Sequence, residues 1–173
     1  MPVTRLNHAV LYVRDVARTR EFYENVLGFR TKVWLEGRAA FFQAPGSTND
    51  HDLGTFQIGS AAGPTQAGKG TVGLYHLAWE VDTLAELERL AGVLEQRGAL
   101  VGATDHVTTK SLYAMDPDGL EFEVCWVLPA DLLSDDVLAA AAAGTMVPLN
   151  LAEEIARYGA DTRGGVGVSI PVA

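Results

Sequence analysis

Short apolar stretches, separated by turn residues, define the elements that this chain is expected to form. Residues 6–13 are predicted to form a strand, and Asp15 can cap a helix that runs over about 16–26. Gly28 is typical of a helix end, because glycine adopts the left-handed backbone conformation there without strain. Further strands are predicted near residues 30–35, 39–44 and 53–58.

The second half of the chain repeats this order of elements. A strand over residues 74–81 leads to a helix near 84–97, which is expected to stop at Gly98. The two opening strands also echo each other in sequence around His8 and His76. An internal repeat determines a fold more strongly than local propensity does, so we predict an α+β protein built from two β-α-β-β-β modules. The remaining strands of the second module are expected near residues 99–105, 111–115 and 120–126.

The repeat suggests a division of the chain into four parts. We assign the first module to residues 1–60 and the second to residues 73–128, joined by a linker over 61–72 that is poor in apolar bulk. Residues 129–173 lie outside the repeat and are interpreted as a C-terminal helical extension and tail. Two helices are expected in this extension, over residues 131–143 and 151–158.

The bulk properties narrow the class of protein. The chain has 173 residues, of which 48% are hydrophobic and 20% are charged, the composition of a globular domain. Its formal net charge of −9 argues against nucleic acid or an anionic membrane as a partner. The single cysteine, Cys125, excludes an internal disulfide and is expected to be a buried, inert thiol. Because no signal peptide or membrane span is recognisable, we expect a cytoplasmic protein, and a homodimer by base rate.

The last predicted hairpin determines which side chains face each other. The segment Asp116-Pro117-Asp118-Gly119 suits a type I turn with a glycine bulge, which pairs Asp116 with Leu120. Counting outward from that pair, Tyr113 opposes Glu123. Directly opposed side chains share a face of the sheet, with Cβ atoms about 5 Å apart. Tyr113 and Glu123 are therefore expected to project together.

Glu123, His8 and His76 are the candidate metal ligands. Glu123 lies in a strand that is typical of a core, where an unpaired carboxylate is costly, whereas Glu121 is nearer the turn and is placed at the rim. His8 and His76 hold equivalent early positions in the two modules, so their imidazoles are expected to share a centre. Two histidines and one carboxylate form the facial triad of non-haem Fe(II) sites. The structural alternatives are a solvated strand face for Glu123 and core positions for the histidines.

With these residues in place, the chain resembles the vicinal oxygen chelate superfamily over about residues 4–127. The landmarks are the two Leu-x-His openings, the Tyr-x-x-Asp-Pro-Asp-Gly turn and the Glu-Phe-Glu-Val strand. The resemblance implies that the paired modules form an open, mixed β-barrel that encloses a metal. It does not identify the reaction, because the superfamily includes glyoxalases, fosfomycin-resistance enzymes, epimerases, bleomycin-binding proteins and extradiol catechol dioxygenases.

The other two histidines favour the extradiol dioxygenases within that superfamily. His51 lies in a segment similar to the His-Asp-Leu-Ala-Leu-Phe strand of those enzymes, and His106 lies seven residues before Tyr113, as in their Asp-His…Leu-Tyr segment. The resemblance implies that His51 is an acid–base residue and that His106 and Tyr113 orient the substrate. Many relatives have paired histidines where this chain has Asp50-His51, a difference that bears on the choice of substrate.

The resemblance therefore implies ring cleavage of a catechol-type aromatic diol by O2. His8, His76 and Glu123 would hold Fe(II), with Mn(II) as the alternative metal, and would place both catechol oxygens beside dioxygen. The product would be a compound of the hydroxymuconic-semialdehyde type.

Two other functions remain open on the sequence. A glyoxalase I-like isomerase would use Ni²⁺ or Zn²⁺ and a fourth protein ligand, for which Gln57 is the candidate because Phe56-Gln57-Ile58 parallels Phe122-Glu123-Val124. Such an enzyme would give His51 and His106 no role. A bleomycin-resistance-type protein would bind an aromatic molecule without a reaction, and would leave an unused charged site in the core.

Overall fold

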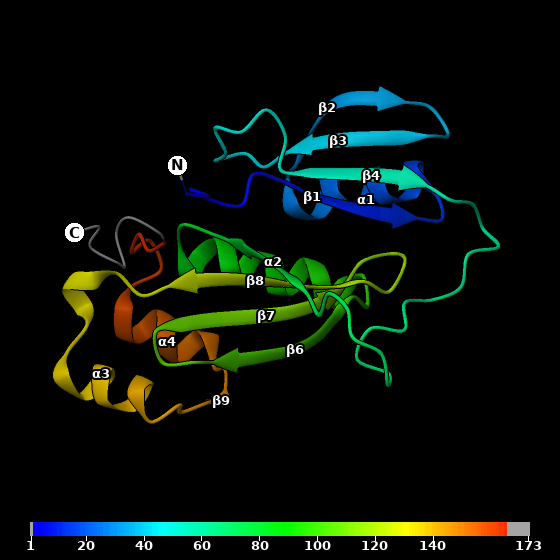
Figure 1. The fold of residues 1–173 in the computed structure, drawn as a ribbon. Helices are drawn as coiled ribbons and strands as arrows, with labels where there is room; N and C mark the ends of the chain where they lie inside the picture. Colours follow the sequence, from blue (N-terminus) through cyan, green and yellow to red (C-terminus); the bar gives the residue numbers. More distant parts are fainter. Residues whose placement is uncertain (1, 166–173) are drawn as a thin grey trace. The chain divides into compact units, whose positions relative to one another are not determined.

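The computed structural model describes residues 2–165, which divide into two compact units (Figure 1). The first unit contains the chain up to Gln66 together with Asp116–Leu120, and the second contains Ala67–Met115 and the chain from Glu121 onward. The end of the predicted tail, residues 166–173, lies outside the described residues. Each unit is built on one β-α-β-β-β order of elements, as the repeat predicts.

The first unit contains a four-stranded sheet with one helix. Its strands are β1 (Ala9–Val13), β2 (Arg30–Leu35), β3 (Ala39–Gln43) and β4 (Leu53–Gln57), in the order β1-β4-β3-β2, with β1 and β4 parallel. Helix α1 (Val16–Leu27) begins where the Asp15 carboxylate accepts hydrogen bonds from two backbone N–H groups, and it ends at Gly28 with φ of 70°. Strand β1 starts at Ala9 rather than at residue 6, so His8 lies immediately before the sheet.

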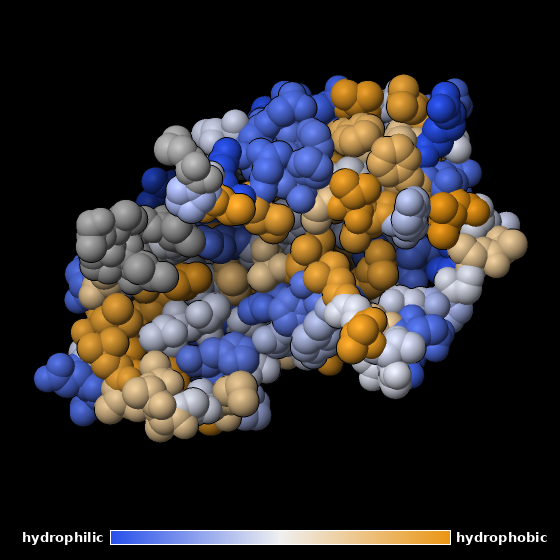
Figure 2. Space-filling model, viewed as in Figure 1, coloured by the Kyte–Doolittle hydropathy of each residue, from blue (hydrophilic) through white to orange (hydrophobic). Residues whose placement is uncertain are grey.

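The two faces of the first sheet differ in character. Leu11, Val13 and Phe42 are buried, and the Phe42 ring stacks on Tyr23 of α1 with centroids 6.1 Å apart. The alternation of strand side chains sends their neighbours to the opposite face. That face carries exposed apolar side chains, and Figure 2 shows them gathered over β2, β3 and β4. They include Val10, Tyr12, Val33, Leu35 and Phe56.

The second unit repeats the arrangement and adds a strand. Its strands are β5 (Leu77–Glu80), β6 (Leu100–Asp105), β7 (Thr109–Met115), β8 (Glu121–Val127) and β9 (Val147–Pro148), in the order β5-β8-β7-β6-β9, with β5 and β8 parallel. Helix α2 (Leu84–Gln96) packs its leucines on this sheet, against buried Leu112 and Val124. Strand β5 starts at Leu77, so His76 lies immediately before it, as His8 lies before β1.

The hairpin between β7 and β8 has the predicted register. The Asp116 N–H donates to the Leu120 carbonyl at 2.9 Å, and Gly119 has φ of 79°. Tyr113 is paired with Glu123 across the two strands. The turn therefore determines which residues of β7 and β8 face each other, as the sequence indicates.

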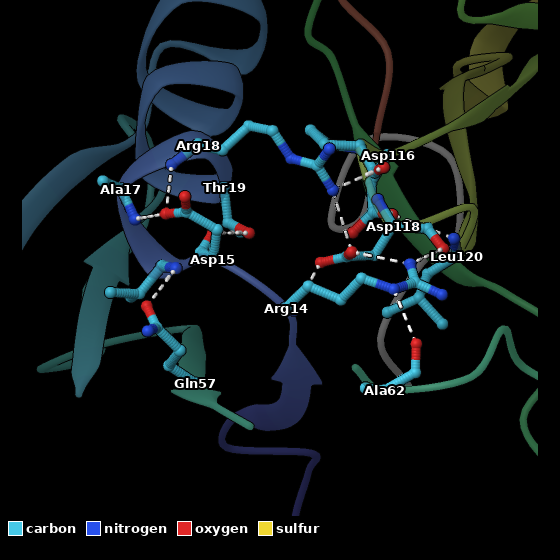
Figure 3. Close-up of polar contacts among 12 residues, drawn as sticks. Arg14, Asp15, Ala17, Arg18, Thr19, Gln57, Ala62, Asp116, Asp118 and Leu120 are labelled. Atoms are coloured by element: carbon cyan, nitrogen blue, oxygen red, sulfur yellow. Dashed lines mark hydrogen bonds and ion pairs between the residues drawn. The ribbon is translucent and has the colours of Figure 1, made fainter. Parts of the chain in front are cut away.

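Asp118 anchors this turn within the first unit (Figure 3). Its carboxylate accepts hydrogen bonds from the Arg14 guanidinium at 2.9 Å, from the Arg14 backbone N–H at 3.0 Å and from the Arg18 guanidinium at 2.9 Å. The Arg18 guanidinium also donates to the Pro117 carbonyl. Because the Asp118 side chain is only 6% exposed, these charge-assisted bonds stabilise the turn more than surface ion pairs would.

The C-terminal extension differs from its prediction in two places. The single helix predicted over 131–143 is interrupted, because Leu133 is extended and Ser134 caps a new helix. The elements here are the 3-10 turn η1 (Ala130–Leu132), α3 (Asp135–Ala142) and α4 (Leu151–Tyr158). Strand β9 was not predicted, since two residues are too short for a periodic pattern. The helix over 151–158, capped by Asn150, is confirmed.

The α+β class is confirmed, with two mixed sheets whose strands do not close into a barrel. The enclosed metal and the boundaries chosen for the four parts of the chain stay predictions. Within residues 2–165, the structure contains no helix with the length and apolar character needed to cross a bilayer.

Candidate functional site

Polar side chains gather on the face of the second sheet that α2 does not cover. Leu112 and Val124 are buried toward the helix, so the alternate residues of β7 and β8 project the other way. With His76 and His106 from the adjoining loops, they form what we call the second-module cluster. Its members are Tyr75, His76, His106, Ser111, Tyr113, Glu121 and Glu123.

His76 and Glu123 form the centre of this cluster. His76 Nε2 lies 3.1 Å from Glu123 Oε2, and the Ser111 hydroxyl donates to Glu123 Oε1 at 2.5 Å. The side chains of His76 and Glu123 are 23% and 12% exposed, so both are largely shielded from water. The carboxylate is thus oriented by Ser111 on one oxygen and faces the imidazole with the other. Ser111 was missed in the sequence, although its position two residues from Tyr113 places it on the same strand face.

Glu121, which is predicted from the sequence to lie at the rim near the turn, approaches His76 and so belongs to the cluster. Its Oε1 lies 3.7 Å from His76 Nδ1, and neither of these buried atoms has a hydrogen bond among residues 2–165. The charge of Glu121, followed by a hydrogen bond to it, raises the pKa of the neighbouring Tyr75 hydroxyl. His76 is therefore flanked by a carboxylate on each ring nitrogen. The predicted hairpin pairs Met115 with Glu121 and so already placed Glu121 on this face. It did not predict how close Glu121 lies to His76.

Tyr113 and His106 form a second pair in the same cluster. The Tyr113 hydroxyl lies 2.8 Å from His106 Nε2, and its ring lies 5.7 Å from the His76 ring. Burial raises the pKa of Tyr113, and the nearby Glu123 charge raises it further. Tyr113 therefore stays protonated near neutral pH and can donate a hydrogen bond. The Tyr113–Glu123 pairing predicted from the hairpin is confirmed. The contact between Tyr113 and His106 was not predicted, although the resemblance implies that both residues orient the substrate.

The other two histidines meet in the first unit. The His8 and His51 rings lie 4.5 Å apart, and the Phe41 ring meets His51 edge-on at 5.1 Å. His51 Nδ1 lies 3.0 Å from the Asp50 carboxylate, whose pKa is lowered by this hydrogen bond. We call His8, Phe41, Asp50 and His51 the first-module cluster. It lies at the edge of the exposed apolar face of the first sheet, since Phe41 also contacts the Phe56 ring.

The strand register identifies Gly54 as the first-module equivalent of Glu123. Glu123 pairs with Ala78, two residues after His76, and Gly54 pairs with Val10, two residues after His8. Phe41, which pairs with Gly54, is likewise equivalent to Tyr113. A Cβ at Gly54 would lie 3.2 Å from the Phe41 ring, so the ring leaves little room for a side chain there.

This register corrects the alignment that matched Gln57 with Glu123. Gln57 lies further along β4, and its Oε1 accepts a hydrogen bond from the Val16 backbone N–H at 3.0 Å. The side chain of Gln57 therefore supports the first turn of α1. The parallel between the segments around Phe56 and Phe122 was misleading because both strands carry the same apolar pattern.

The structure brings the predicted site residues together in pairs. His76 lies beside Glu123, His106 beside Tyr113, and His8 beside His51. Across residues 2–165, no set of three or more His, Cys, Asp or Glu side chains forms a group that could hold a metal ion. The predicted triad combines His8 of the first unit with the His76–Glu123 pair of the second, and it stays a prediction.

The duplicated module and its histidine–glutamate pair define a class of two-module α+β proteins. The chain belongs to the glyoxalase/bleomycin resistance protein/dioxygenase superfamily, whose sequence profile matches residues 5–124. This match includes both histidine-bearing openings and Glu123.

Relatives with different activities share this similarity. The chain is 30% identical over 121 residues to catechol-2,3-dioxygenase of Bacillus subtilis (strain 168), covering 70% of this chain and 41% of that protein. It is 32% identical over 136 residues to lactoylglutathione lyase of Neisseria meningitidis serogroup A, and the match covers 69% of this chain and 88% of that protein. The chain thus spans less than half the length of the dioxygenase.

Solved structures share the fold at lower identity. A glyoxalase/dioxygenase from Nostoc punctiforme matches with a TM-score of 0.58 and 24% identity, covering 70% of this chain and 89% of that chain. The fosfomycin resistance protein FosX from Mesorhizobium loti matches with a TM-score of 0.52 and 23% identity, and the match covers 72% of this chain and 92% of that chain.

Proposed function

We propose that this protein is an extradiol dioxygenase, which cleaves a catechol-type aromatic diol with O2 at a non-haem Fe(II) centre. The observation that carries the proposal is the second-module cluster, in which the His76–Glu123 pair lies beside the His106–Tyr113 pair. One pair has the atoms that bind a metal, and the other has the hydrogen-bonding groups that orient a phenolic substrate. The similarity to catechol-2,3-dioxygenase supports the same reaction.

The His76–Glu123 pair fits a metal in its donor atoms and their spacing. Imidazole nitrogen and carboxylate oxygen bind metals at about 2.1 Å, so two such ligands at a right angle lie about 3 Å apart. The observed separation of His76 Nε2 and Glu123 Oε2 is 3.1 Å. The unbonded His76 Nδ1 faces Glu121, in the way that metal-bound imidazoles commonly face an outer carboxylate. In this proposal, His8 completes the Fe(II) ligands, and Mn(II) is the alternative metal.

A metal held by His8, His76 and Glu123 would supply a positive centre that makes the substrate hydroxyls more acidic and activates dioxygen. Side chains of the protein would transfer the proton and orient the substrate. His51 takes a proton from the substrate and later returns it, since an imidazole whose Nδ1 donates to Asp50 presents Nε2 as its basic atom. Tyr113, kept protonated by its raised pKa, donates a hydrogen bond to a substrate oxygen. His106 holds the Tyr113 hydroxyl in position.

A glyoxalase I-like isomerase is the second candidate, favoured by the similarity to lactoylglutathione lyase. Such an enzyme usually takes a fourth ligand from the first module, at the position equivalent to Glu123. Gly54 occupies that position here, and Gln57 is bonded to the start of α1. The first module therefore lacks a side chain at the ligand position, which favours the dioxygenase. A bleomycin-resistance-type binding protein would show neither activity.

The experiment loads the protein with Fe(II) without oxygen, adds a panel of catechols and then admits air. We expect O2 uptake that matches the appearance of a yellow ring-opened product. If iron is bound and no catechol supports O2 uptake, the dioxygenase proposal is wrong. A parallel assay with Ni²⁺ or Zn²⁺ and the hemithioacetal of methylglyoxal and glutathione tests the isomerase.

A substitution at His51 tests the proposed division of roles. The His51→Ala variant should retain its iron and lose about 10²-fold or more in turnover, the usual contribution of an acid–base residue. Loss of iron instead would mean that His51 is a metal ligand and that its assignment is wrong.

A further inference from the structure

Lys110 is a buried cation on the opposite side of β7 from the second-module cluster. Its neighbour Ser111 belongs to the cluster, so Lys110 projects toward the helices, where it is only 1% exposed. A buried ammonium group is strongly unfavourable unless carboxylates neutralise it. The surroundings of Lys110 therefore have to supply negative charge.

Two carboxylates meet this need, one from β6 and one from α4. Its Nζ lies 2.6 Å from Asp105 Oδ1 at the end of β6. It also lies 2.8 Å from Glu154 Oε2 on α4, an ion pair without the alignment of a hydrogen bond. The Tyr158 ring, on the next turn of α4, lies 5.6 Å from the same ammonium. The C-terminal extension thus completes the environment of a residue in the core of the second module.

Asp105 connects this ion pair to the loop that carries His106. Besides Lys110, Asp105 Oδ1 accepts a hydrogen bond from the Val107 N–H at 2.7 Å. Val107 has φ of 71° and is the one non-glycine residue with positive φ among residues 2–165. A β-branched residue is strained in this conformation and keeps it only when its surroundings hold it there. His106, the residue before it, reaches Tyr113 from this strained loop.

The extension also contacts the base of the loop through its short strand. In β9, Val147 pairs with Asp105 and Pro148 pairs with Thr104. Two separate parts of the extension, β9 and α4, therefore act on Asp105, one through the backbone and the other through Lys110. No residue of the extension belongs to the second-module cluster itself.

We propose that the C-terminal extension is a positioning element for His106. Glu154 neutralises Lys110, Lys110 holds Asp105, and Asp105 holds Val107 in the conformation that keeps His106 against Tyr113. Glu154 and Lys110 are positioning residues, because neither belongs to the cluster. An effect of the extension on catalysis rests on the function proposed above. The contacts that lead from Glu154 to His106 do not depend on that function.

The variant Glu154→Gln tests the proposal, because it removes the charge and keeps the size of the side chain. The matched control is Glu153→Gln, which makes the same change at the adjacent, exposed position of α4. Hydrogen exchange of the backbone amides over residues 105–109 is compared with exchange in α2. We expect Glu154→Gln to accelerate exchange in the loop by at least about tenfold, the effect of weakening a charge-assisted hydrogen bond, and to leave α2 unchanged. Glu153→Gln should match the wild-type protein in both segments.

A second readout follows His106 directly. The ring-nitrogen NMR signals of His106, assigned by their loss in His106→Asn, should shift in Glu154→Gln and not in Glu153→Gln. Unchanged loop exchange and unchanged His106 signals would overturn the proposal, and so would equal acceleration of exchange throughout the second unit. If Glu154→Gln does not fold, Glu154→Asp, which keeps the charge but shortens the side chain by a methylene group, is compared with Glu153→Asp, and the same acceleration confined to the loop is expected.

Neither readout requires iron or a catechol, so failure of the proposed function and failure of the positioning role are distinguishable. If the dioxygenase activity is present, Glu154→Gln should lower kcat several-fold with little change in KM and in iron content. Loss of activity through loss of iron would contradict a role that acts through His106.

Discussion

Asp116 gives the turn between β7 and β8 a stability that depends on pH. Its Oδ1 accepts hydrogen bonds from the Asp118 N–H at 2.8 Å and the Leu120 N–H at 2.9 Å. Its Oδ2 is buried without a hydrogen bond among the described residues. Burial is the largest effect and raises the pKa of Asp116 to about 6, although the two backbone hydrogen bonds oppose it. We predict that Asp116→Asn removes this pH dependence.

The sign and size follow from the raised pKa. The carboxyl group has a pKa of 3.8 without the fold and about 6 within it, so the folded state holds the proton more tightly. The stabilisation that comes from this tighter proton binding to Asp116 is complete below about pH 4 and is lost as the pH rises through about 6. A shift of about two units corresponds to roughly 3 kcal/mol at 1.36 kcal/mol per unit. Asn is neutral at every pH and keeps the oxygen that accepts both hydrogen bonds.

The assay is urea unfolding of the wild-type protein and Asp116→Asn, between about pH 4 and about pH 7. We expect Asp116→Asn to gain about 2–3 kcal/mol in free energy of unfolding relative to the wild type over this range. Asp131→Asn is the control, because it makes the same change at an exposed carboxylate and should leave the pH profile unchanged. Parallel profiles for Asp116→Asn and the wild type would refute the reasoning.

Two further predictions concern residues of β8. Glu123→Gln should abolish stoichiometric iron binding, whereas Glu121→Gln should weaken iron binding by about 10–100-fold, as expected for an outer carboxylate. The iron content of each variant after dialysis distinguishes the two roles. Equal losses of iron in the two variants would contradict the assignment. Burial, followed by the charges of Glu123 and Glu80, raises the pKa of the Cys125 thiol to about 12. Iodoacetamide should therefore leave Cys125 unmodified in the folded protein at about pH 8 and alkylate it fully in urea, and rapid modification of the folded protein would show that the thiol is accessible.

Features that depend on local chemistry were predicted well. The Asp-Pro-Asp-Gly turn allows few backbone geometries, so counting outward from it gave the observed pairing of Tyr113 with Glu123. The repeat predicted both modules, because the same order of strands and helix occurs twice. Cys125 is buried, as its apolar neighbours indicate.

Features that depend on strand register or on distant contacts were not predicted. Gly54, rather than Gln57, corresponds to Glu123. The sequence alone does not show this, because only the hydrogen-bonded pairing with β1 distinguishes neighbouring positions of β4. The approach of Glu121 to His76 depends on how the loop before β5 is placed. The pairing of Lys110 with Glu154 joins residues far apart in the chain, and no periodic pattern indicates such a contact.

The most direct test of the central claim is the fate of labelled dioxygen. The Fe(II)-loaded protein is supplied with the catechol that gives the fastest O2 uptake, under an atmosphere of ¹⁸O2, and the ring-opened product is analysed by mass spectrometry. Because an extradiol dioxygenase inserts both oxygen atoms into the ring that it cleaves, we predict a product that carries two labelled atoms. A catechol that is consumed without incorporation of label, or that remains intact although iron is bound, would contradict the account.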